Sequence, residues 1–126
     1  MNYLSQWIAN GFFNYWVSTP IFPNRTARKI KKMTIEGFQK QIEAIYYTRD
    51  AERGVPLTFT WFVEEVGELA KEIRKQPQDM ERLREEFADV FAWLATLASL
   101  LDISLEDAAQ IYAEGCPKCK NTPCSC

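Results

Sequence analysis

The feature that most constrains the fold is a pair of apolar stripes with helical period, one on each side of Pro77. A helix turns about 100° per residue, so apolar residues spaced by three and four positions share one face. The stripe before the proline comprises Phe62, Val66, Leu69 and Ile73, and the stripe after it comprises Leu83, Phe87, Val90, Leu94, Leu97 and Leu101. Proline breaks a helix, and a loop as short as residues 75–79 makes its flanking helices antiparallel. The sequence therefore predicts a helical hairpin packed stripe against stripe, with Asp79 capping its second helix.

Four acidic residues are placed symmetrically about the same proline. They are Glu65 and Glu68 before it and Glu86 and Asp89 after it, at distances of twelve, nine, nine and twelve residues. Measured from the start of its own stripe, each pair falls at roughly 300° and 240° around the helix. In an antiparallel hairpin, these matched angles and heights are expected to bring the four carboxylates together. Glu72 and Arg82 are also symmetric, five residues from Pro77, and predict an ion pair between the helices.

Converging carboxylates favour a metal site of a particular kind. Four carboxylates in one place repel one another, and some would have to stay protonated without a cation. Oxygen ligands suit Mg²⁺, Mn²⁺ or Ca²⁺ rather than zinc or copper. The alternative is that these acids only solvate the exposed flanks of two amphipathic helices.

Composition excludes several other kinds of site. The chain has 126 residues, enough for one domain, and contains no histidine, which excludes His-based triads, His metal sites and Glu-x-x-His ligands. Residues 1–35 contain five Lys or Arg and no acid, whereas residues 36–126 contain ten basic and seventeen acidic residues. An acidic main domain argues against non-specific nucleic-acid binding.

The chain divides into three predicted segments. Residues 1–32 are rich in aromatic and basic residues, and we interpret them as an N-terminal extension; an arm that binds a membrane surface or a partner is the alternative. Residues 33–115 form a helical domain, and residues 116–126 form a cysteine-rich tail. The class is all-α, a four-helix bundle. About ninety residues make a modest core, so we expect homo-oligomerisation to complete it.

The helix boundaries follow from capping and breaking residues. The four predicted helices run from Thr34 to before Gly54, from about residues 58–60 to Lys75, from about Met80 to Leu101, and from Ser104 to Gly115. Thr34 and Ser104 are N-cap residues, and Asp107 completes a capping box.

The stretch from Thr58 to Glu68 and the stretch from Glu85 to Asp89 resemble a known signature. It is that of the MazG-type all-α nucleoside triphosphate pyrophosphohydrolases, E-E-x-x-E followed by a spacer and E-x-x-D. The signature reads Glu64, Glu65 and Glu68, then Glu86 and Asp89 after a spacer of seventeen residues. The resemblance extends from about Met33 to the C-terminus. It includes the RDAERG motif at residues 49–54 and the cysteine motifs of the tail.

The resemblance implies cleavage of a nucleoside triphosphate between its α and β phosphates, giving a monophosphate and pyrophosphate. It implies that Glu65, Glu68, Glu86 and Asp89 hold Mg²⁺, with Mn²⁺ as a substitute. Glu64 and Glu85 adjoin these ligands and are the candidate catalytic residues, although each could be a solvated surface acid. A ligand such as Glu65 is an alternative general base.

Two aromatic and three basic residues are candidate substrate contacts. Trp61 and Trp93 lie sixteen residues on either side of Pro77 and could stack on a nucleobase; alternatively, they belong to the core or to an interface between subunits. Relatives carry basic residues late in the last helix, but residues 103–115 contain none. The substitutes for phosphate binding are Lys40, Arg49 and Arg53, or Lys118 and Lys120 in the tail.

The tail holds all four cysteines, Cys116, Cys119, Cys124 and Cys126. Their spacing allows a structural Zn²⁺ site, and free thiols on a loose tail are the alternative. A disulfide framework is not expected.

Together these features predict a cytoplasmic, Mg²⁺-dependent nucleoside triphosphate pyrophosphohydrolase that clears unwanted nucleotides and forms a homodimer or homotetramer. Nucleic-acid binding and membrane contact are not expected. The alternative is a non-catalytic helical oligomer that binds a metal or a nucleotide, which the missing late basic residues favour.

Overall fold

The computed structural model describes residues 32–126, and the predictions made for residues 1–31 lie outside that range. Within it the chain forms α2 (Ile35–Arg53), α3 (Val55–Arg74), α4 (Met80–Leu100) and α5 (Leu105–Gln110), with no strand. These four helices confirm the all-α class. No helix among these residues is both long enough and apolar enough to cross a membrane.

The helix starts are set by the side chains that the sequence marks as caps. Thr34, Asp79 and Ser104 each accept hydrogen bonds from backbone N–H groups two or three residues further on, at 2.9–3.2 Å. Each bond satisfies a donor that the first helical turn would leave without a partner. The N-caps of α2, α4 and α5 are therefore as predicted.

Two boundaries differ from the prediction. Helix α3 starts at Val55 rather than at residues 58–60. Pro56 is tolerated in its first turn, because N–H groups there have no hydrogen-bond partner within the helix. Gly54, with φ of 79°, separates α3 from α2. Helix α5 ends at Gln110 rather than at Gly115, because the next backbone bonds span three residues instead of four, as in Ile111 to Ala108.

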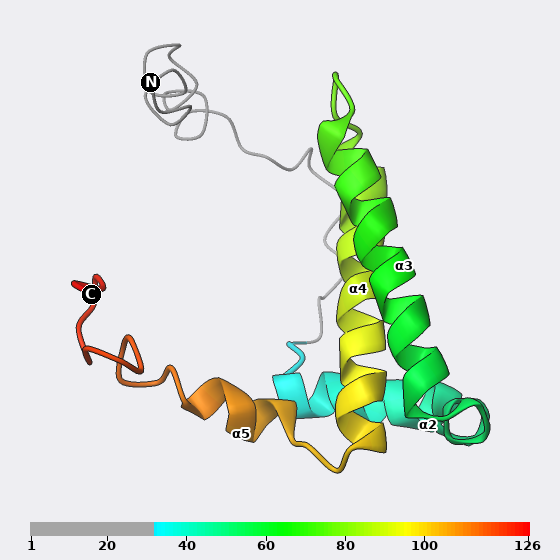
Figure 1. The fold of residues 1–126 in the computed structure, drawn as a ribbon, viewed down its shortest axis with the longest axis horizontal. Helices are drawn as coiled ribbons and strands as arrows, with labels where there is room; N and C mark the ends of the chain where they lie inside the picture. The colour runs from blue at the N-terminus through cyan, green and yellow to red at the C-terminus, as the bar shows by residue number, and fades with distance from the viewer. Residues whose placement is uncertain (1–31) are drawn as a thin grey trace. The chain divides into compact units, whose positions relative to one another are not determined.

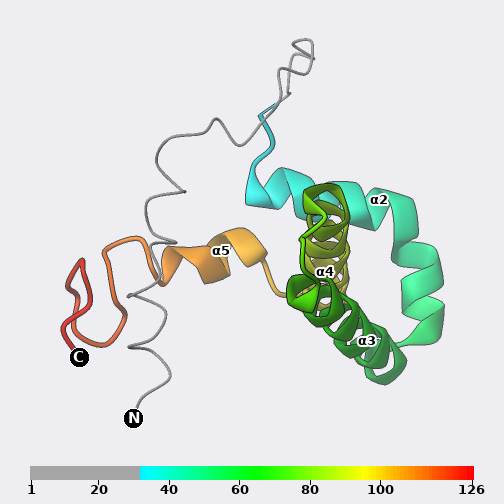
Figure 2. The same cartoon turned by 90° about the horizontal axis from the view of Figure 1, so that it is seen from above.

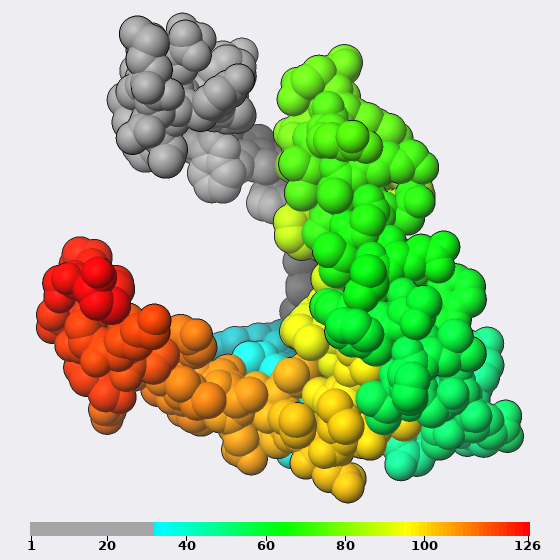
Figure 3. All heavy atoms as spheres, in the orientation of Figure 1, coloured from blue at the N-terminus to red at the C-terminus, as the bar shows by residue number. Residues whose placement is uncertain are grey.

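Helices α3 and α4 form the predicted antiparallel hairpin. They lie side by side along their length, joined by residues 75–79, and α2 crosses them at the end opposite this loop (Figures 1 and 2). In the space-filling view, atoms of α3 lie in front of much of α4 (Figure 3), and residues of the two helices are in contact. The hairpin is thus the element that places residues before and after Pro77 opposite one another.

The seam of the hairpin is rotated away from the predicted stripes. Leu83 and Leu97 are buried, but Val66, Ile73, Phe87, Leu94 and Leu101 are 40–58% exposed. The side chains most deeply buried along the seam include the polar Thr58, Glu72 and Glu86. Each helix carries an apolar band wider than one helix–helix contact can cover. The contact between α3 and α4 buries the edge of that band nearest the acids and leaves the other edge exposed. The prediction that the two stripes pack directly against each other was therefore wrong.

A stacked ring pair and a buried amide are among the contacts that fix helix α2 to α4 and α5. Phe38 of α2 stacks on Phe91 of α4, with centroids 4.4 Å apart and planes 2° apart. Gln39 donates to Ser99 Oγ at 3.1 Å and to the Ile103 carbonyl at 2.9 Å. Its Oε1 accepts from the Leu105 N–H at 2.9 Å. Because this buried amide is satisfied at both ends, it specifies how α2 meets the α4–α5 turn.

Candidate functional site

Three of the four predicted acidic ligands meet between α3 and α4. Glu65, Glu86 and Asp89 each offer a carboxylate oxygen, and these oxygens lie within 4.8 Å of one another. Glu86 is buried, Glu65 is half-buried and Asp89 is exposed, so the cluster is accessible from solvent at Asp89. The donors are all carboxylate oxygens, which is the chemistry that hard divalent cations prefer.

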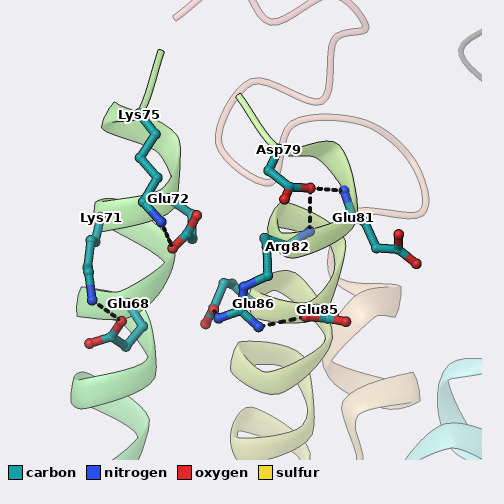
Figure 4. A network of polar contacts seen from close by, with 9 residues as sticks. All are labelled: Glu68, Lys71, Glu72, Lys75, Asp79, Glu81, Arg82, Glu85 and Glu86. Atoms are coloured by element: carbon teal, nitrogen blue, oxygen red, sulfur yellow. Dashed lines mark hydrogen bonds and ion pairs between the residues drawn. The ribbon is translucent and has the colours of Figure 1, made fainter. Parts of the chain in front are cut away.

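Glu68, the fourth predicted ligand, lies outside this cluster. Its Oε2 accepts from Lys71 Nζ at 3.1 Å, one turn nearer the hairpin loop (Figure 4). Both side chains are about half exposed, 46% for Glu68 and 55% for Lys71. An ion pair this exposed contributes little stability, so a change of rotamer can release the Glu68 carboxylate at small cost.

Arg82 pairs with two acids of its own helix. Its Nη2 lies 3.0 Å from Glu86 Oε1, and its Nη1 lies 2.7 Å from Glu85 Oε2 (Figure 4). Because Glu86 is buried, the guanidinium compensates a charge that would be costly to leave alone. Within the described part of the chain, these contacts replace the predicted ion pair with Glu72, whose Oε1 instead lies 2.5 Å from Lys75 Nζ.

Glu72 is a buried acid that the hairpin does not fully satisfy. It is 3% exposed, and its Oε2 has no hydrogen-bond partner. We expect Glu72→Met to raise the free energy of unfolding by about 1 kcal/mol or more, because a thioether of similar length removes the buried, half-satisfied charge. Urea denaturation at pH 7.5 measures this change.

The matched control for that substitution is Lys75→Met. It removes the partner but leaves the buried carboxylate, and is therefore expected to lower the free energy of unfolding by about 1 kcal/mol. If Glu72→Met and Lys75→Met lowered the free energy of unfolding equally, the contact between Glu72 and Lys75 would be stabilising. The burial of Glu72 would then carry no net cost.

Glu65 feels the electrostatic cost of the cluster. Burial raises the pKa of its carboxyl, and the neighbouring charges of Asp89, Glu86 and Glu64 raise it further. A hydrogen bond from the Trp93 side chain lowers it in part. Protonation of Glu65, or a cation bound beside it, would therefore relieve the repulsion between its carboxylate and the neighbouring acids.

A cavity of about 410 Å³ adjoins the cluster at Asp89. Its lining comes from α2, α3 and α4 and comprises Tyr46, Arg49, Asp50, Arg53, Trp61, Asp89, Ala92, Trp93 and Thr96. The structure therefore places four of the predicted substrate contacts, Trp61, Trp93, Arg49 and Arg53, in one cavity beside a predicted metal ligand.

The two indoles of this cavity have different surroundings. Trp61 and Trp93 stack with centroids 6.2 Å apart and planes 14° apart. The Arg53 guanidinium lies 4.9 Å from the centre of the Trp93 ring. Trp93 is thus in contact with both Trp61 and Arg53, whereas Trp61 is 42% exposed and is the ring more open to an incoming molecule.

Asp50 was missed as a site residue by the sequence analysis. It is buried, and its two oxygens bind Arg53 Nη1 at 2.9 Å and Thr96 Oγ1 at 3.1 Å. The bond to Arg53 fixes the guanidinium that lies over Trp93. The available signal was an acid three residues before Arg53, the spacing of an ion pair on one helix face.

The remaining predicted residues are placed as follows. Lys40 pairs with Glu36 and lines a different cavity, with Ser99 and Ile103, so the structure does not bring it to Trp61 and Trp93. Glu64 is exposed and close enough to Glu65 for its charge to raise the pKa of that carboxyl, after the larger effects of burial, Asp89 and Glu86. Glu85 is held by Arg82.

Comparison with known protein families gives one match, and it covers this hairpin. The model of the MazG nucleotide pyrophosphohydrolase domain matches residues 55–119, from the start of α3 to the second cysteine of the tail. No curated protein matches the chain. The match spans more than half of the sequence and includes Glu65, Glu68, Glu86 and Asp89. It agrees with the all-α architecture. The chain belongs to the MazG nucleotide pyrophosphohydrolase family.

Proposed function

We propose that this protein is a Mg²⁺-dependent nucleoside triphosphate pyrophosphohydrolase that converts NTP or dNTP and water to the monophosphate and pyrophosphate. The observation that carries the proposal is the meeting of the Glu65, Glu86 and Asp89 oxygens within 4.8 Å beside an aromatic and basic cavity. A nucleotide needs these two environments together, one for its phosphates and one for its base. Nucleotide-pool clean-up is the proposed role.

The acids fit Mg²⁺ by their chemistry. Glu65, Glu86 and Asp89 would hold it, and Glu68 would join them after leaving Lys71. A bound Mg²⁺ neutralises phosphate charge and acidifies a coordinated water. Mn²⁺ takes the same oxygen ligands.

The cavity supplies the substrate contacts of the proposal. Trp61, the more exposed indole, offers a face to a base of any kind. Arg53 is oriented by Asp50, and Arg49 lies beside the Tyr46 ring at 5.2 Å. These two arginines take the place of the basic residues that residues 103–115 lack, and they bind phosphate oxygens through their guanidinium groups.

Glu64 is the proposed general base. Glu85 already accepts a hydrogen bond from Arg82, and this guanidinium leaves its carboxylate less available to accept a proton. Glu64 is exposed beside Glu65 and can accept a proton from a water held at the cluster.

A homodimer or homotetramer is proposed to cover the exposed edge of the hairpin. Val66, Phe87 and Leu94 are each at least 40% exposed on adjacent helices, which is a large apolar surface for a monomer. Light scattering of the full chain at micromolar concentration is expected to give a mass of two or four chains. A single-chain mass would contradict this. A cytoplasmic location, where thiols stay reduced, fits the four free cysteines.

A substrate panel tests the proposed reaction. The full chain is incubated with each NTP and dNTP, with and without Mg²⁺, and the products are separated by chromatography. Mg²⁺-dependent formation of monophosphate and pyrophosphate supports the proposal. Nucleotide binding without turnover would support a non-catalytic binder instead. Release of orthophosphate with a diphosphate would place cleavage at the wrong bond.

Trp61→Ala is expected to raise KM for nucleotide substrates by about 5- to 150-fold, because stacking on one aromatic side chain contributes about 1–3 kcal/mol per base. The change in kcat should be smaller, since the base lies away from the reacting phosphate. Steady-state kinetics on the best substrate of the panel measures both constants. Tyr47→Ala is the control, because Tyr47 is an exposed aromatic of α2 that does not line this cavity. An unchanged KM for Trp61→Ala would remove Trp61 from the base site.

A further inference from the structure

The four cysteine sulfurs lie together at the end of the chain. Those of Cys116, Cys119, Cys124 and Cys126 all lie within 4.8 Å of one another. The separations are 3.7 Å for Cys116 and Cys126, 3.8 Å for Cys119 and Cys124, and 3.2 Å for Cys124 and Cys126. A disulfide needs about 2.05 Å, so these sulfurs are not bonded to each other. A tetrahedral ion with metal–sulfur bonds of about 2.3 Å has sulfur–sulfur edges of about 3.8 Å.

The backbone around the first two cysteines forms a tight loop. The Lys120 N–H donates to the Cys116 carbonyl at 2.7 Å, and the Cys116 N–H donates to the Asn121 carbonyl at 3.2 Å. Lys120 has φ of 61°, a left-handed conformation that costs a non-glycine residue about 1–2 kcal/mol. This conformation turns the chain so that the second cysteine pair comes back over the first.

Backbone N–H groups point at the sulfurs within this loop. The N–H groups of Cys119 and Lys118 hydrogen-bond to Cys116 Sγ. Those of Ser125 and Asn121 hydrogen-bond to Cys119 Sγ. Such donors orient ligand atoms around a metal.

Apart from a few hydrogen bonds, such as that from Asn121 Nδ2 to Ser125 Oγ at 2.6 Å, the tail has no apolar core to hold this shape. Residues 116–126 contain lysine, asparagine, threonine, serine and proline besides cysteine, and no aliphatic or aromatic side chain. Thiol groups are weak hydrogen-bond donors. A segment with no apolar core requires a different source of stability, and metal binding supplies it in small domains.

We propose that Cys116, Cys119, Cys124 and Cys126 form a structural Zn²⁺ site that folds the tail, separate from the acidic cluster. Four thiolates and no open position match the closed tetrahedral sites of structural zinc. The ion and four thiolates carry a net charge of −2, which Lys118 and Lys120 on the same loop offset.

The metal content of the untagged full chain tests this proposal. After purification with reductant and dialysis, elemental analysis is expected to give one zinc per chain. All the cysteines of the chain belong to this group, so a thiol reagent reports on this site alone. The thiols should react slowly in the purified protein, and zinc should leave as they react. The double variant Cys124→Ser/Cys126→Ser should hold no zinc and keep the helical circular dichroism of the parent protein.

A second variant tests the loop without touching a ligand. Gly115 has φ of 104°, and a Cβ there would lie 2.8 Å from Thr122 Oγ1 and 3.1 Å from two carbonyl oxygens. Gly115→Ala is therefore expected to weaken Co²⁺ binding, followed by its visible tetrahedral thiolate bands, roughly tenfold. Gly67→Ala is the matched control, because a Cβ at Gly67 meets nothing within 4 Å.

Three results would overturn the proposal. They are a metal-free protein with four rapidly reacting thiols that binds no Co²⁺ after reduction, stoichiometric iron in place of zinc, or two disulfides in protein purified under reducing conditions. None of these measurements uses hydrolysis, so they stand whether or not the proposed reaction is found.

Discussion

Asp89→Asn is expected to lower kcat for Mg²⁺-dependent pyrophosphate release by at least about 100-fold. Asp89 is the exposed member of the acidic cluster and the one that also lines the cavity, so it stands where metal and phosphate would meet. Replacing even a side chain that supports a metal ligand costs about 10- to 100-fold in affinity or activity. Loss of a ligand beside the reacting phosphate should cost at least as much. Initial rates over a Mg²⁺ titration measure the effect.

The design of this test separates metal binding from folding. Asn is nearly isosteric with Asp, and the exposed side chain should tolerate the change. Glu52→Gln, at an exposed acid of α2, removes the same charge away from the cluster and should leave kcat within about twofold. If Asp89→Asn kept the parent rate at all Mg²⁺ concentrations, the acidic cluster could not be the metal site of the reaction.

The hairpin could be predicted from sequence because its determinants are local. A proline in a short loop, an Asp N-cap and two helical-period stripes each act within a few residues. The matched positions of Glu65 and Asp89 about Pro77 then follow from helix geometry alone. The structure brings the oxygens of Glu65 and Asp89 together. This could be predicted without knowing any contact between distant parts of the chain.

The choice of side chains in the seam could not be predicted in the same way. Val66 and Phe87 lie in the stripes, but they are exposed, while Glu72 and Glu86 are buried. Neighbouring residues lie about 100° apart around a helix. A rotation of the helix about its axis by roughly half of that angle buries one edge of a wide apolar band and exposes the other. Which edge is buried depends on the other helices and subunits that pack against the band. The helical spacing of the apolar residues does not identify those packing partners.

The pairing of individual acids was also beyond the sequence. Glu68 and Glu86 lie at equal distances from Pro77, yet Glu68 bonds to Lys71 and only Glu86 joins the cluster. Asp50 lies in a separate helix from the acid signature, and only the packing of α2 on α4 brings it to Thr96. Rotamer choices and contacts between distant helices decide these positions, at energies of about 1 kcal/mol.

Mg²⁺ is expected to stabilise the folded protein, and to do so more strongly as pH rises. An ion that binds only the native state adds about 2.7 kcal/mol at one hundred times its dissociation constant. In a domain of this size each kcal/mol raises the midpoint of thermal unfolding by roughly 4–8 °C. Thermal unfolding with EDTA and with 10 mM Mg²⁺, at several pH values, measures the difference. Na₂SO₄ at equal ionic strength controls for screening, and the Asp89→Asn variant should lose most of the gain.

The pH dependence follows from Glu65. Burial first, and the Asp89 charge second, raise the pKa of its carboxyl above that of the unfolded chain. In the metal-free protein, this group stabilises the fold most at pH values below its unfolded pKa, and that contribution is lost as pH rises through the folded pKa. Bound Mg²⁺ replaces the proton and removes this loss, so the gap between the curves with and without Mg²⁺ should widen from acidic to neutral pH. A gap that stayed constant with pH would mean that Glu65 does not contact the ion.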